Sequence, residues 1–244
     1  MDYYIYQDNN GSVVRTDIDL SLADRVPQDE RSWLLWAFVK IKSPNKILWC
    51  EERECETLLN IRIRLEEQVK KSLDAVFVAG RMQDGWQEFY FYAPGAKKFE
   101  NSVKEVMRSF DGYAFETGST KDRKWEKYIR ELYPDLLMAQ QIESRYIINE
   151  LEEAGDRLES EREVEHYLFF QTDAQAQRAQ ESLRGSGYFL KEIVNQEGDY
   201  SHGIVMTKEH AVNEEKLMEE TAIMIKASAD EYGIYEGWST VLAK

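Results

Sequence analysis

This sequence contains three histidines, whose side chains are the best suited to acid–base or metal chemistry near neutral pH. His166 and His202 fall on stretches that we expect to be neighbouring strands, with carboxylates nearby in sequence at Glu165 and Asp199, and the third is His210. An imidazole beside a carboxylate suits proton transfer, and two imidazoles make half of a zinc site. The spacing supplies no third zinc ligand, so histidines at the surface or on an edge strand are the competing interpretation.

Two cysteines, Cys50 and Cys55, lie five positions apart. A redox pair or half of a metal site is the functional interpretation, but neither a further cysteine nor a histidine lies nearby to complete a site. We expect two reduced thiols at a strand–helix junction. Few cysteines in the reduced state fit a cytoplasmic protein.

Motifs of the common enzyme classes are missing from the sequence. It contains no glycine-rich phosphate loop, no HExxH pair and no Ser-His-Asp order of a hydrolase. Carboxylate pairs occur throughout so acidic a chain, so their presence does not indicate acid–base catalysis. We therefore predict no catalytic residues, no cofactor and no metal, and a protein that is not an enzyme.

Composition indicates a folded, acidic protein. The chain has 244 residues, of which 43% are hydrophobic, and its net charge is −15. This length allows two domains, and the charge disfavours direct binding of nucleic acid while it suits a basic protein partner. Acids dominate residues 143–165, either as a docking surface for such a partner or as an ordinary solvated helix face. We expect no signal peptide, no membrane span of ~20 apolar residues and a cytoplasmic location.

The first part of the chain predicts strands and helices in the order β-α-β-β-α-β behind a short hairpin. The hairpin turns at Asn10-Gly11, and a helical stripe of apolar residues covers 52–73. This order is typical of a ferredoxin-like, or split βαββαβ, domain. The expected strands are 3–7, 12–20, 32–42, 74–82, 86–92 and 113–117, and the expected helices are 52–73 and 96–110.

The last part repeats the same order after a helical stretch, 122–158, that Pro134 interrupts. We expect Pro134 to lie in the first turn of a new helix and Asp173 to be an N-cap. The fold class is thus α+β, with two ferredoxin-like sandwiches that have antiparallel sheets. The predicted domains are 1–134 and 161–244, joined by an acidic helical connector at 135–160. The expected elements of the second domain are the strands 164–170, 188–195 and 200–207, a helix after Asp173 that carries Ala176, Ala179 and Leu183, the helix 211–231 and an aromatic tail as the fourth strand.

The C-terminal domain resembles the family of regulators of ribonuclease activity B (RraB). The features that match are the alternating strand Val164–Phe170, Ala174–Ala179 in the next helix, Gly187-Tyr188, the strand Gly203–Met206 and the tail Tyr235-Glu236-Gly237-Trp238. Tails in that family typically read Gly-x-Tyr-Asp-Gly-Trp, and this chain has Glu236 in place of the aspartate. The resemblance implies a ferredoxin-like fold and a protein that inhibits endoribonuclease E by contact, with no catalytic residues.

The N-terminal domain, over residues 1–134, resembles the domain of unknown function 695 family. The matching residues are Val78-Ala79-Gly80-Arg81, the strand Phe89–Tyr92, Asp122-Arg123-Lys124-Trp125-Glu126-Lys127-Tyr128 and Leu132-Tyr133-Pro134. This family often precedes an RraB-like domain, so the two resemblances support each other. For the N-terminal domain the resemblance implies a fold only.

Aromatic residues are the candidates for contact with a partner. Tyr235, Glu236 and Trp238 form the predicted partner-contact site, because Trp and Tyr dominate interface energies; the alternative is that the two aromatics close the core of their own domain. Trp125 and Tyr128 share a helix face that either packs on the sheet or forms a ligand platform.

The leading hypothesis is that this is a regulatory binding protein, similar to the ribonuclease regulators. Its expected partner is another protein, and a ribonuclease is one candidate. The alternatives are an enzyme or small-ligand protein with His166 or His202 in an interdomain cleft, and a structural module that forms homo-oligomers. The sequence does not give the oligomeric state.

Overall fold

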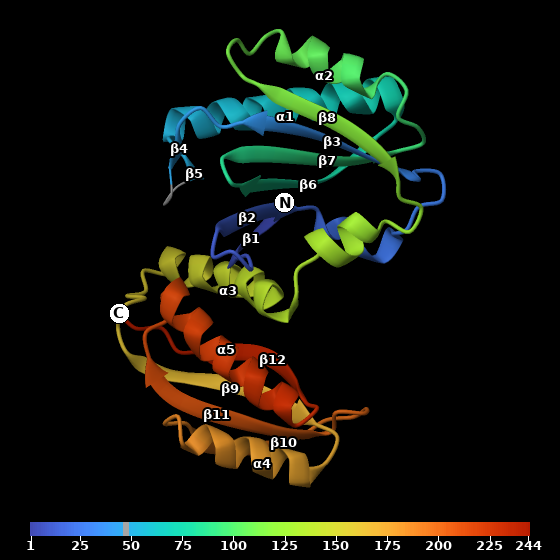
Figure 1. The fold of residues 1–244 in the computed structure, drawn as a ribbon. Helices are drawn as coiled ribbons and strands as arrows, with labels where there is room; N and C mark the ends of the chain where they lie inside the picture. Colours follow the sequence, from blue (N-terminus) through green and yellow to red (C-terminus); the bar gives the residue numbers. More distant parts are fainter. Residues whose placement is uncertain (46–48) are drawn as a thin grey trace. The chain divides into compact units, whose positions relative to one another are not determined.

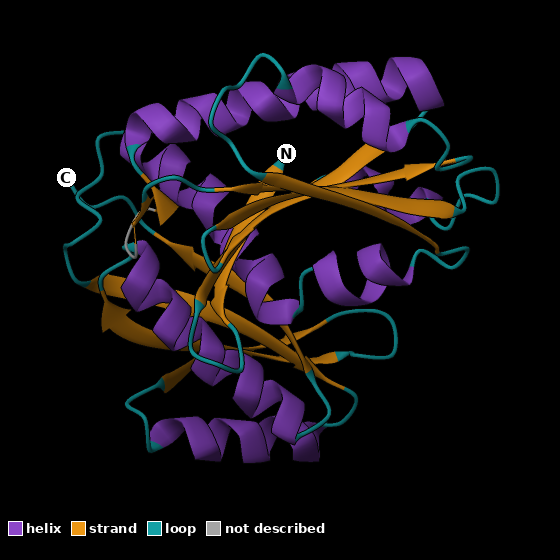
Figure 2. Ribbon diagram, turned by 45° about the horizontal axis from the view of Figure 1, so that its top comes forward, coloured by secondary structure: helices purple, strands orange, loops and turns teal. Residues whose placement is uncertain are grey.

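The computed structural model of this protein describes residues 1–45 and 49–244, and its contacts divide the chain into two units, Met1–Tyr133 and Pro134–Lys244. Each unit is α+β and contains one large antiparallel sheet (Figures 1 and 2). Among the described residues, no helix combines the length and the apolar character that crossing a bilayer requires.

The first unit is a six-stranded sheet in the order β1-β2-β6-β7-β3-β8. Strands β3, β6, β7 and β8 with helices α1 and α2 form the predicted β-α-β-β-α-β order, and the β1–β2 hairpin extends the sheet beside β6. Two short features were not predicted, the β4–β5 pair and the 3-10 helix η1, whereas the π-helix η2 falls within the stretch 122–158 that was predicted to be helical. The bounds are β1 Asp2–Gln7, β2 Val13–Ile18, η1 Leu20–Arg25, β3 Trp33–Lys40, β4 Pro44–Asn45, β5 Trp49–Cys50, α1 Glu52–Leu73, β6 Val76–Gln83, β7 Trp86–Ala93, α2 Phe99–Met107, β8 Phe115–Lys121 and η2 Lys127–Leu132.

Helices α1 and α2 cover one face of this sheet (Figure 1). The predicted stripe of α1 is confirmed, because Leu58, Ile61, Leu65 and Val69 are all buried in the core against β3 and β7. The helix ends at Asp74, whose left-handed backbone (φ 53°) lets its N–H bond the carbonyl of Lys70.

The opposite face is closed by the segment around Trp125. Its indole ring stacks on Tyr92 at 3.9 Å between centroids and donates a hydrogen bond to the carbonyl of Arg31 at 2.9 Å. Asp122 accepts from the Tyr92 hydroxyl at 2.6 Å and from the backbone N–H of Glu126 at 2.9 Å. Trp125 and Tyr128 are fully buried, so the packing interpretation is confirmed. They do not share a helix face as expected, because Trp125 (φ 56°) precedes the helix that contains Tyr128.

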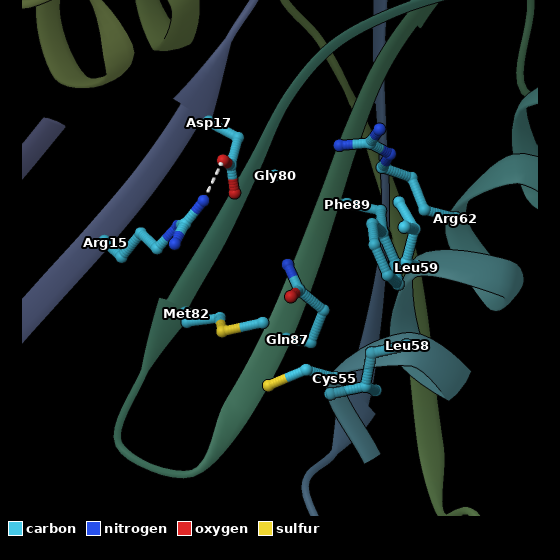
Figure 3. A pocket seen from close by; sticks show the side chains of 10 residues that line it. All are labelled: Arg15, Asp17, Cys55, Leu58, Leu59, Arg62, Gly80, Met82, Gln87 and Phe89. Atoms are coloured by element: carbon cyan, nitrogen blue, oxygen red, sulfur yellow. Dashed lines mark hydrogen bonds and ion pairs between the residues drawn. The ribbon is translucent and has the colours of Figure 1, made fainter. Parts of the chain in front are cut away.

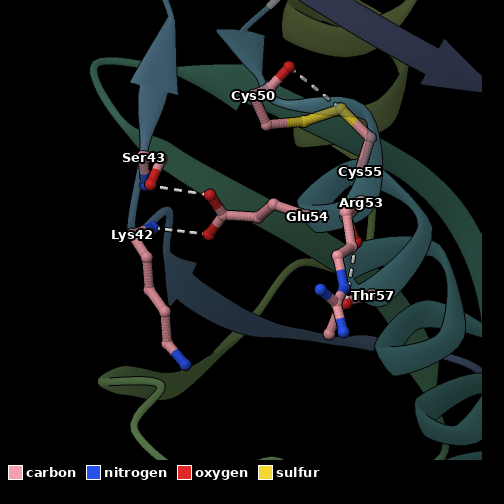
Figure 4. Close-up of a disulfide and its surroundings, with 7 residues drawn as sticks. All are labelled: Lys42, Ser43, Cys50, Arg53, Glu54, Cys55 and Thr57. Atoms are coloured by element: carbon pink, nitrogen blue, oxygen red, sulfur yellow. Dashed lines mark hydrogen bonds between the residues drawn. A yellow bond between two sulfur atoms is a disulfide. The ribbon is translucent and has the colours of Figure 1, made fainter.

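The two cysteines form a disulfide, which corrects the expectation of reduced thiols (Figure 4). Cys50 ends β5 and Cys55 lies in the first turns of α1, and this tight junction brings their Cα atoms to 5.7 Å, within the range that a disulfide spans. The Glu54 carboxylate fixes the same junction, because it accepts from the backbone N–H groups of Lys42 at 2.6 Å and Ser43 at 2.8 Å.

Removal of this disulfide is expected to destabilise the first unit alone. The double substitution Cys50→Ser/Cys55→Ser frees a loop of a few residues in the unfolded chain, which costs about 2 kcal/mol in the loop-entropy estimate. Hydrogen exchange of the full chain measures this as faster exchange of the α1 and β7 amides, with exchange of the second unit unchanged. Equal protection of α1 in the two proteins would show that the bond contributes no stability.

The second unit has a four-stranded sheet in the order β10-β11-β9-β12. The predicted β-α-β-β-α-β order is present, and α4 and α5 pack on one face, where they share a core with β9 and β11. Asp173 is the first residue of α4, and Thr172 is the N-cap in place of the predicted Asp173. The bounds are α3 Leu136–Glu153, β9 Arg162–Phe170, α4 Asp173–Arg184, β10 Phe189–Asn195, β11 His202–His210, α5 Glu214–Asp230 and β12 Ile234–Thr240.

The segment 135–160, which we expected to be a solvated connector, packs as part of the second unit. Helix α3 lies along α5, and its Ser144 and Ile148 side chains are buried. The helix begins after Pro134, which precedes the Asp135 N-cap and so lies outside the first turn. Beyond α3, the Asp156 carboxylate binds Arg162 at 2.6 Å and the backbone N–H of residue 243 at 2.8 Å, so buried polar groups anchor this segment.

Candidate functional site

The closing motif Tyr235-Glu236-Gly237-Trp238 contains a β-bulge. Tyr235 pairs with Leu168 and Trp238 pairs with His166, whereas Glu236 has no partner in the ladder. One extra residue in a strand reverses the alternation of its side chains, so Tyr235 and Trp238 both face the core. Gly237 makes this possible, because its φ of 132° lies where side chains are strained. The motif therefore specifies a bulged strand.

The bulge decides which of the three predicted contact residues a partner could touch. Tyr235 is 3% exposed and Trp238 is 6% exposed, and the Trp238 indole donates to the Ser144 hydroxyl of α3 at 2.9 Å. Glu236 is exposed, and the Gln196 amide reaches its carboxylate at 3.4 Å. In this structure only Glu236 presents its side chain to solvent, while the two aromatics hold β12 to the core.

Two histidines meet in the core of the second unit beneath Tyr235. His166 Nδ1 lies 2.9 Å from the Tyr235 hydroxyl, and His166 Nε2 lies 3.3 Å from His210 Nε2. His210 Nδ1 lies 2.7 Å from the carbonyl oxygen of Ala211, which can only accept. This fixes one direction along the chain: Tyr235 donates to His166, His166 donates to His210, and His210 donates to Ala211. Both rings are neutral in that arrangement.

Burial keeps this histidine pair uncharged. It lowers the pKa of His166 to about 3, with the nearby His210 as a second cause, and it lowers the pKa of His210 as well. His166 is fully buried and His210 is 2% exposed. The pair is therefore closed to a substrate and suits a structural role.

His202 belongs to a different group from His166. Its Nδ1 lies 2.9 Å from the Asp173 carboxylate at the partly exposed start of α4. The two histidines that we considered together from the sequence thus do not share a site, and His210 takes the place of His202 beside His166. The sequence could not show this, because the contact depends on the β9–β11 register. Among residues 1–45 and 49–244, no three His, Cys, Asp or Glu side chains converge as metal ligands do.

A buried carboxylate, Glu220 of α5, lies next to the histidine pair. Burial alone would raise the pKa of Glu220, but hydrogen bonds from Lys216, Tyr188 and Lys208 outweigh it and lower that pKa to about 2. Lys208 and Lys216 each approach the carboxylate at 2.9 Å. The cluster is fully paired, so no uncompensated charge is buried where α5 packs on β11.

Negative charge is concentrated in the second unit. Residues 134–244 contain 23 Asp and Glu against 10 Lys and Arg, a net charge of −13, whereas residues 1–133 contain 23 against 21, a net charge of −2. A surface of one sign attracts partners of the other sign over distances near the Debye length. This difference in net charge can be counted from the sequence, but only once the boundary between the two units is known.

Part of this charge lies on the face of the β9–β11 sheet opposite α4 and α5, which we call the helix-free face. Glu163 and Glu165 of β9 project there, and the register places Glu209 opposite Glu163. Lys191 of β10 bridges Glu163 and Glu165, with 2.6 Å to the latter. Beside them the Phe189 ring of the edge strand is 68% exposed. An acidic patch with an exposed aromatic ring is suited to protein contact.

Comparison with curated proteins and with solved structures gives only distant similarity. No curated protein matches the chain. Among solved structures, an unknown protein from Galdieria sulphuraria has 10% identity, with 87% of this chain and 100% of that chain covered and a TM-score of 0.23. A protein provisionally named a glycine cleavage system transcriptional repressor has 9% identity, with 86% and 98% covered and a TM-score of 0.25.

Two family models match adjacent parts of the chain. The model described as "Regulator of ribonuclease activity B" matches residues 141–240, and the "Family of unknown function (DUF695)" matches residues 3–133. The first match begins inside α3, which agrees with the packing of that helix on the second unit. The second match covers more than half of the 244 residues. The chain therefore belongs to the family of unknown function 695 and carries a C-terminal unit that matches the regulators of ribonuclease activity B.

Proposed function

We propose that this protein is a non-enzymatic regulator whose second unit binds a basic surface of an RNA-degrading enzyme and inhibits it. The match of residues 141–240 to the regulators of ribonuclease activity B supports a regulatory role through protein contact. The net charge of −13 on that unit is the observation that supports a basic partner surface. A ribonuclease of the E type is the first candidate partner.

Electrostatics suggests how inhibition would work. An enzyme that binds RNA needs Lys and Arg side chains that neutralise phosphates. Carboxylates at Glu163, Glu165 and Glu209 offer the same sign of charge on a folded surface, so the helix-free face would compete with RNA for those side chains. The exposed Phe189 ring adds apolar area of the kind that RNA bases present to such enzymes.

The cytoplasm is the compartment that we propose, because RNA decay takes place there. Disulfides are uncommon in that reducing compartment, so the Cys50–Cys55 bond gives a way to test the location. If the protein is cytoplasmic, extraction under alkylating conditions should trap a substantial fraction of both cysteines as reduced thiols. A fully oxidised pair would indicate an oxidising compartment.

Binding to the enzyme is expected to depend on the acids of the helix-free face. The triple substitution Glu163→Gln/Glu165→Gln/Glu209→Gln should weaken binding to ribonuclease E about tenfold or more, because each exposed ion pair contributes up to about 1 kcal/mol. Calorimetry at low and at physiological salt measures the affinity, and an RNA cleavage assay measures the loss of inhibition.

A matched triple, Glu150→Gln/Glu181→Gln/Glu215→Gln, removes the same charge from exposed positions of α3, α4 and α5. It should bind nearly as well as the unaltered chain. Equal weakening by both triples would contradict a specific face and leave net charge as the cause. Absence of binding and of any effect on cleavage at low salt would overturn the proposed function itself.

A further inference from the structure

The first unit contains a cavity of about 210 Å³ between helix α1 and the strands β2, β6 and β7 (Figure 3). It lies on the face of the sheet that α1 and α2 cover, near the edge where the β1–β2 hairpin extends the sheet beside β6. All of its lining residues belong to this unit. Neither the function proposed above nor the match of the unit to a family of unknown function assigns it a role.

Two rows of the sheet form the floor of the cavity. In one row, Arg15 pairs with Met82 and Met82 pairs with Gln87; in the next row, Asp17 pairs with Gly80 and Gly80 pairs with Phe89. Gly80 stands at the centre of these rows, and a Cβ built there would lie 3.3 Å from Gln87 Nε2. The cavity is therefore open because this strand position has no side chain.

Helix α1 forms the roof with one of its faces. Cys55, Leu58, Leu59 and Arg62 follow the i, i+3, i+4, i+7 spacing that places side chains on one side of a helix. Leu58 is 1% exposed and Leu59 is 46% exposed, so the cavity has a buried apolar end and an opening to solvent near Leu59. The disulfide to Cys50 fixes Cys55 in the wall.

Two guanidinium groups, of Arg15 and Arg62, give the cavity an excess of positive charge over the one carboxylate that lines it. Asp17 pairs with an amino group of Arg15 at 2.9 Å, but Arg15 Nε is buried and has no hydrogen-bond partner among the described residues. Arg62 Nε lies 3.2 Å from a Glu66 oxygen, but neither of these two buried atoms has a hydrogen-bond partner among the described residues. The arginines thus retain donor capacity.

We propose that this cavity binds a small monocarboxylic acid, with its carboxylate on Arg15 and Arg62 and its apolar tail against Leu58, Met82 and Phe89. A guanidinium matches a carboxylate with two parallel hydrogen bonds, which is why arginines recognise this group. The size also fits, since an apolar cavity of about 150 Å³ holds benzene. A ring or a short chain with one carboxylate fills the remaining volume.

The first test compares two probes on the unaltered full chain. Benzoate and benzamide have nearly the same shape, but only benzoate carries the charge. In an NMR titration, benzoate should shift the backbone amides of β6, β7 and the first half of α1, and benzamide should bind at least about tenfold more weakly. Absence of shifts at these amides with benzoate, or equal binding of the two probes, would overturn the proposal.

Variants then locate the site. Arg62→Gln should weaken benzoate at least about tenfold, and the control Arg53→Gln, on an exposed position of the same helix, should not. Gly80→Val should fill the hollow and abolish binding, and circular dichroism shows whether this variant is folded. If Arg62→Gln binds as well as Arg53→Gln, or if folded Gly80→Val still binds, the site lies elsewhere and the proposal is wrong.

Discussion

Replacement of Trp238 by alanine is expected to destabilise the second unit by about 3–5 kcal/mol, which is a large part of the stability of a domain of this size. The residue sits 6% exposed at the junction of three elements, in a cluster with Ile148, Val164 and Leu217. Its removal takes away the apolar contacts, leaves a cavity and deprives the buried Ser144 hydroxyl of the hydrogen bond that the indole donates to it.

Hydrogen exchange of the full chain separates this effect from the rest of the molecule. The amides of β9, β12 and α3 should lose most of their protection in Trp238→Ala, while those of β3 and β7 keep theirs. The control is Glu236→Ala, one of the three predicted contact residues, which should change stability by less than about 0.5 kcal/mol because its side chain is exposed.

The same pair of variants distinguishes a core residue from a contact residue. If Trp238 were a binding hot spot, its alanine variant would retain protection of β9 and lose affinity for the partner. Glu236 is the member of the tail that can contact a partner directly, so Glu236→Ala should alter binding more than stability. Unchanged exchange in Trp238→Ala would contradict the core assignment.

The sequence predicted the elements well where one face of an element has a clear period. The stripe Leu58, Ile61, Leu65 and Val69 marked α1 over the same residues that the structure assigns, and the order of strands gave both ferredoxin-like units. Helix α3 was harder, because two of its buried residues, Gln140 and Ser144, are polar, and because its burial depends on α5 and β12, which lie far away in the sequence. A single-helix pattern does not contain that information.

The site depended on details that sequence patterns do not encode. The bulge at Glu236 reverses the direction of Trp238, and a tail read with strict alternation places Tyr235 and Trp238 on opposite faces. The His166–His210 contact depends on the register and twist of two strands 44 positions apart. The cavity beside Gly80 requires three strands and a helix in place together.

Acid is expected to weaken the second unit well before its carboxylates are protonated. A histidine in the unfolded chain titrates near pH 6.5, whereas the pKa of buried His166 is lowered to about 3. Below pH 6.5 the unfolded chain therefore binds a proton at this histidine, whereas the folded unit does not. The stability from the neutral ring is fully present above about pH 6.5 and is lost progressively as the pH falls toward 3.

The size and the pH window of this loss identify its source. At pH 5, which is 1.5 units below the unfolded pKa, His166 alone costs about 2 kcal/mol, and His210, whose pKa is also lowered, adds to it. The charged groups around the pair are Glu220, Lys208 and Lys216. Glu220 has a lowered pKa, so its stabilisation is present above pH 4.5 and is lost only below that value, as the pH falls toward about 2.

Hydrogen exchange at pH 7 and pH 5, corrected for the intrinsic rates, measures the loss at β9 and β11. The first unit is the internal reference, because all three histidines lie in the second unit. His166→Phe removes one titrating group and should reduce the dependence between pH 6.5 and 5 to the part that His210 contributes, even if it lowers stability at every pH. Histidine C2–H resonances that titrate near 6.5 for both His166 and His210 would contradict the buried, neutral pair.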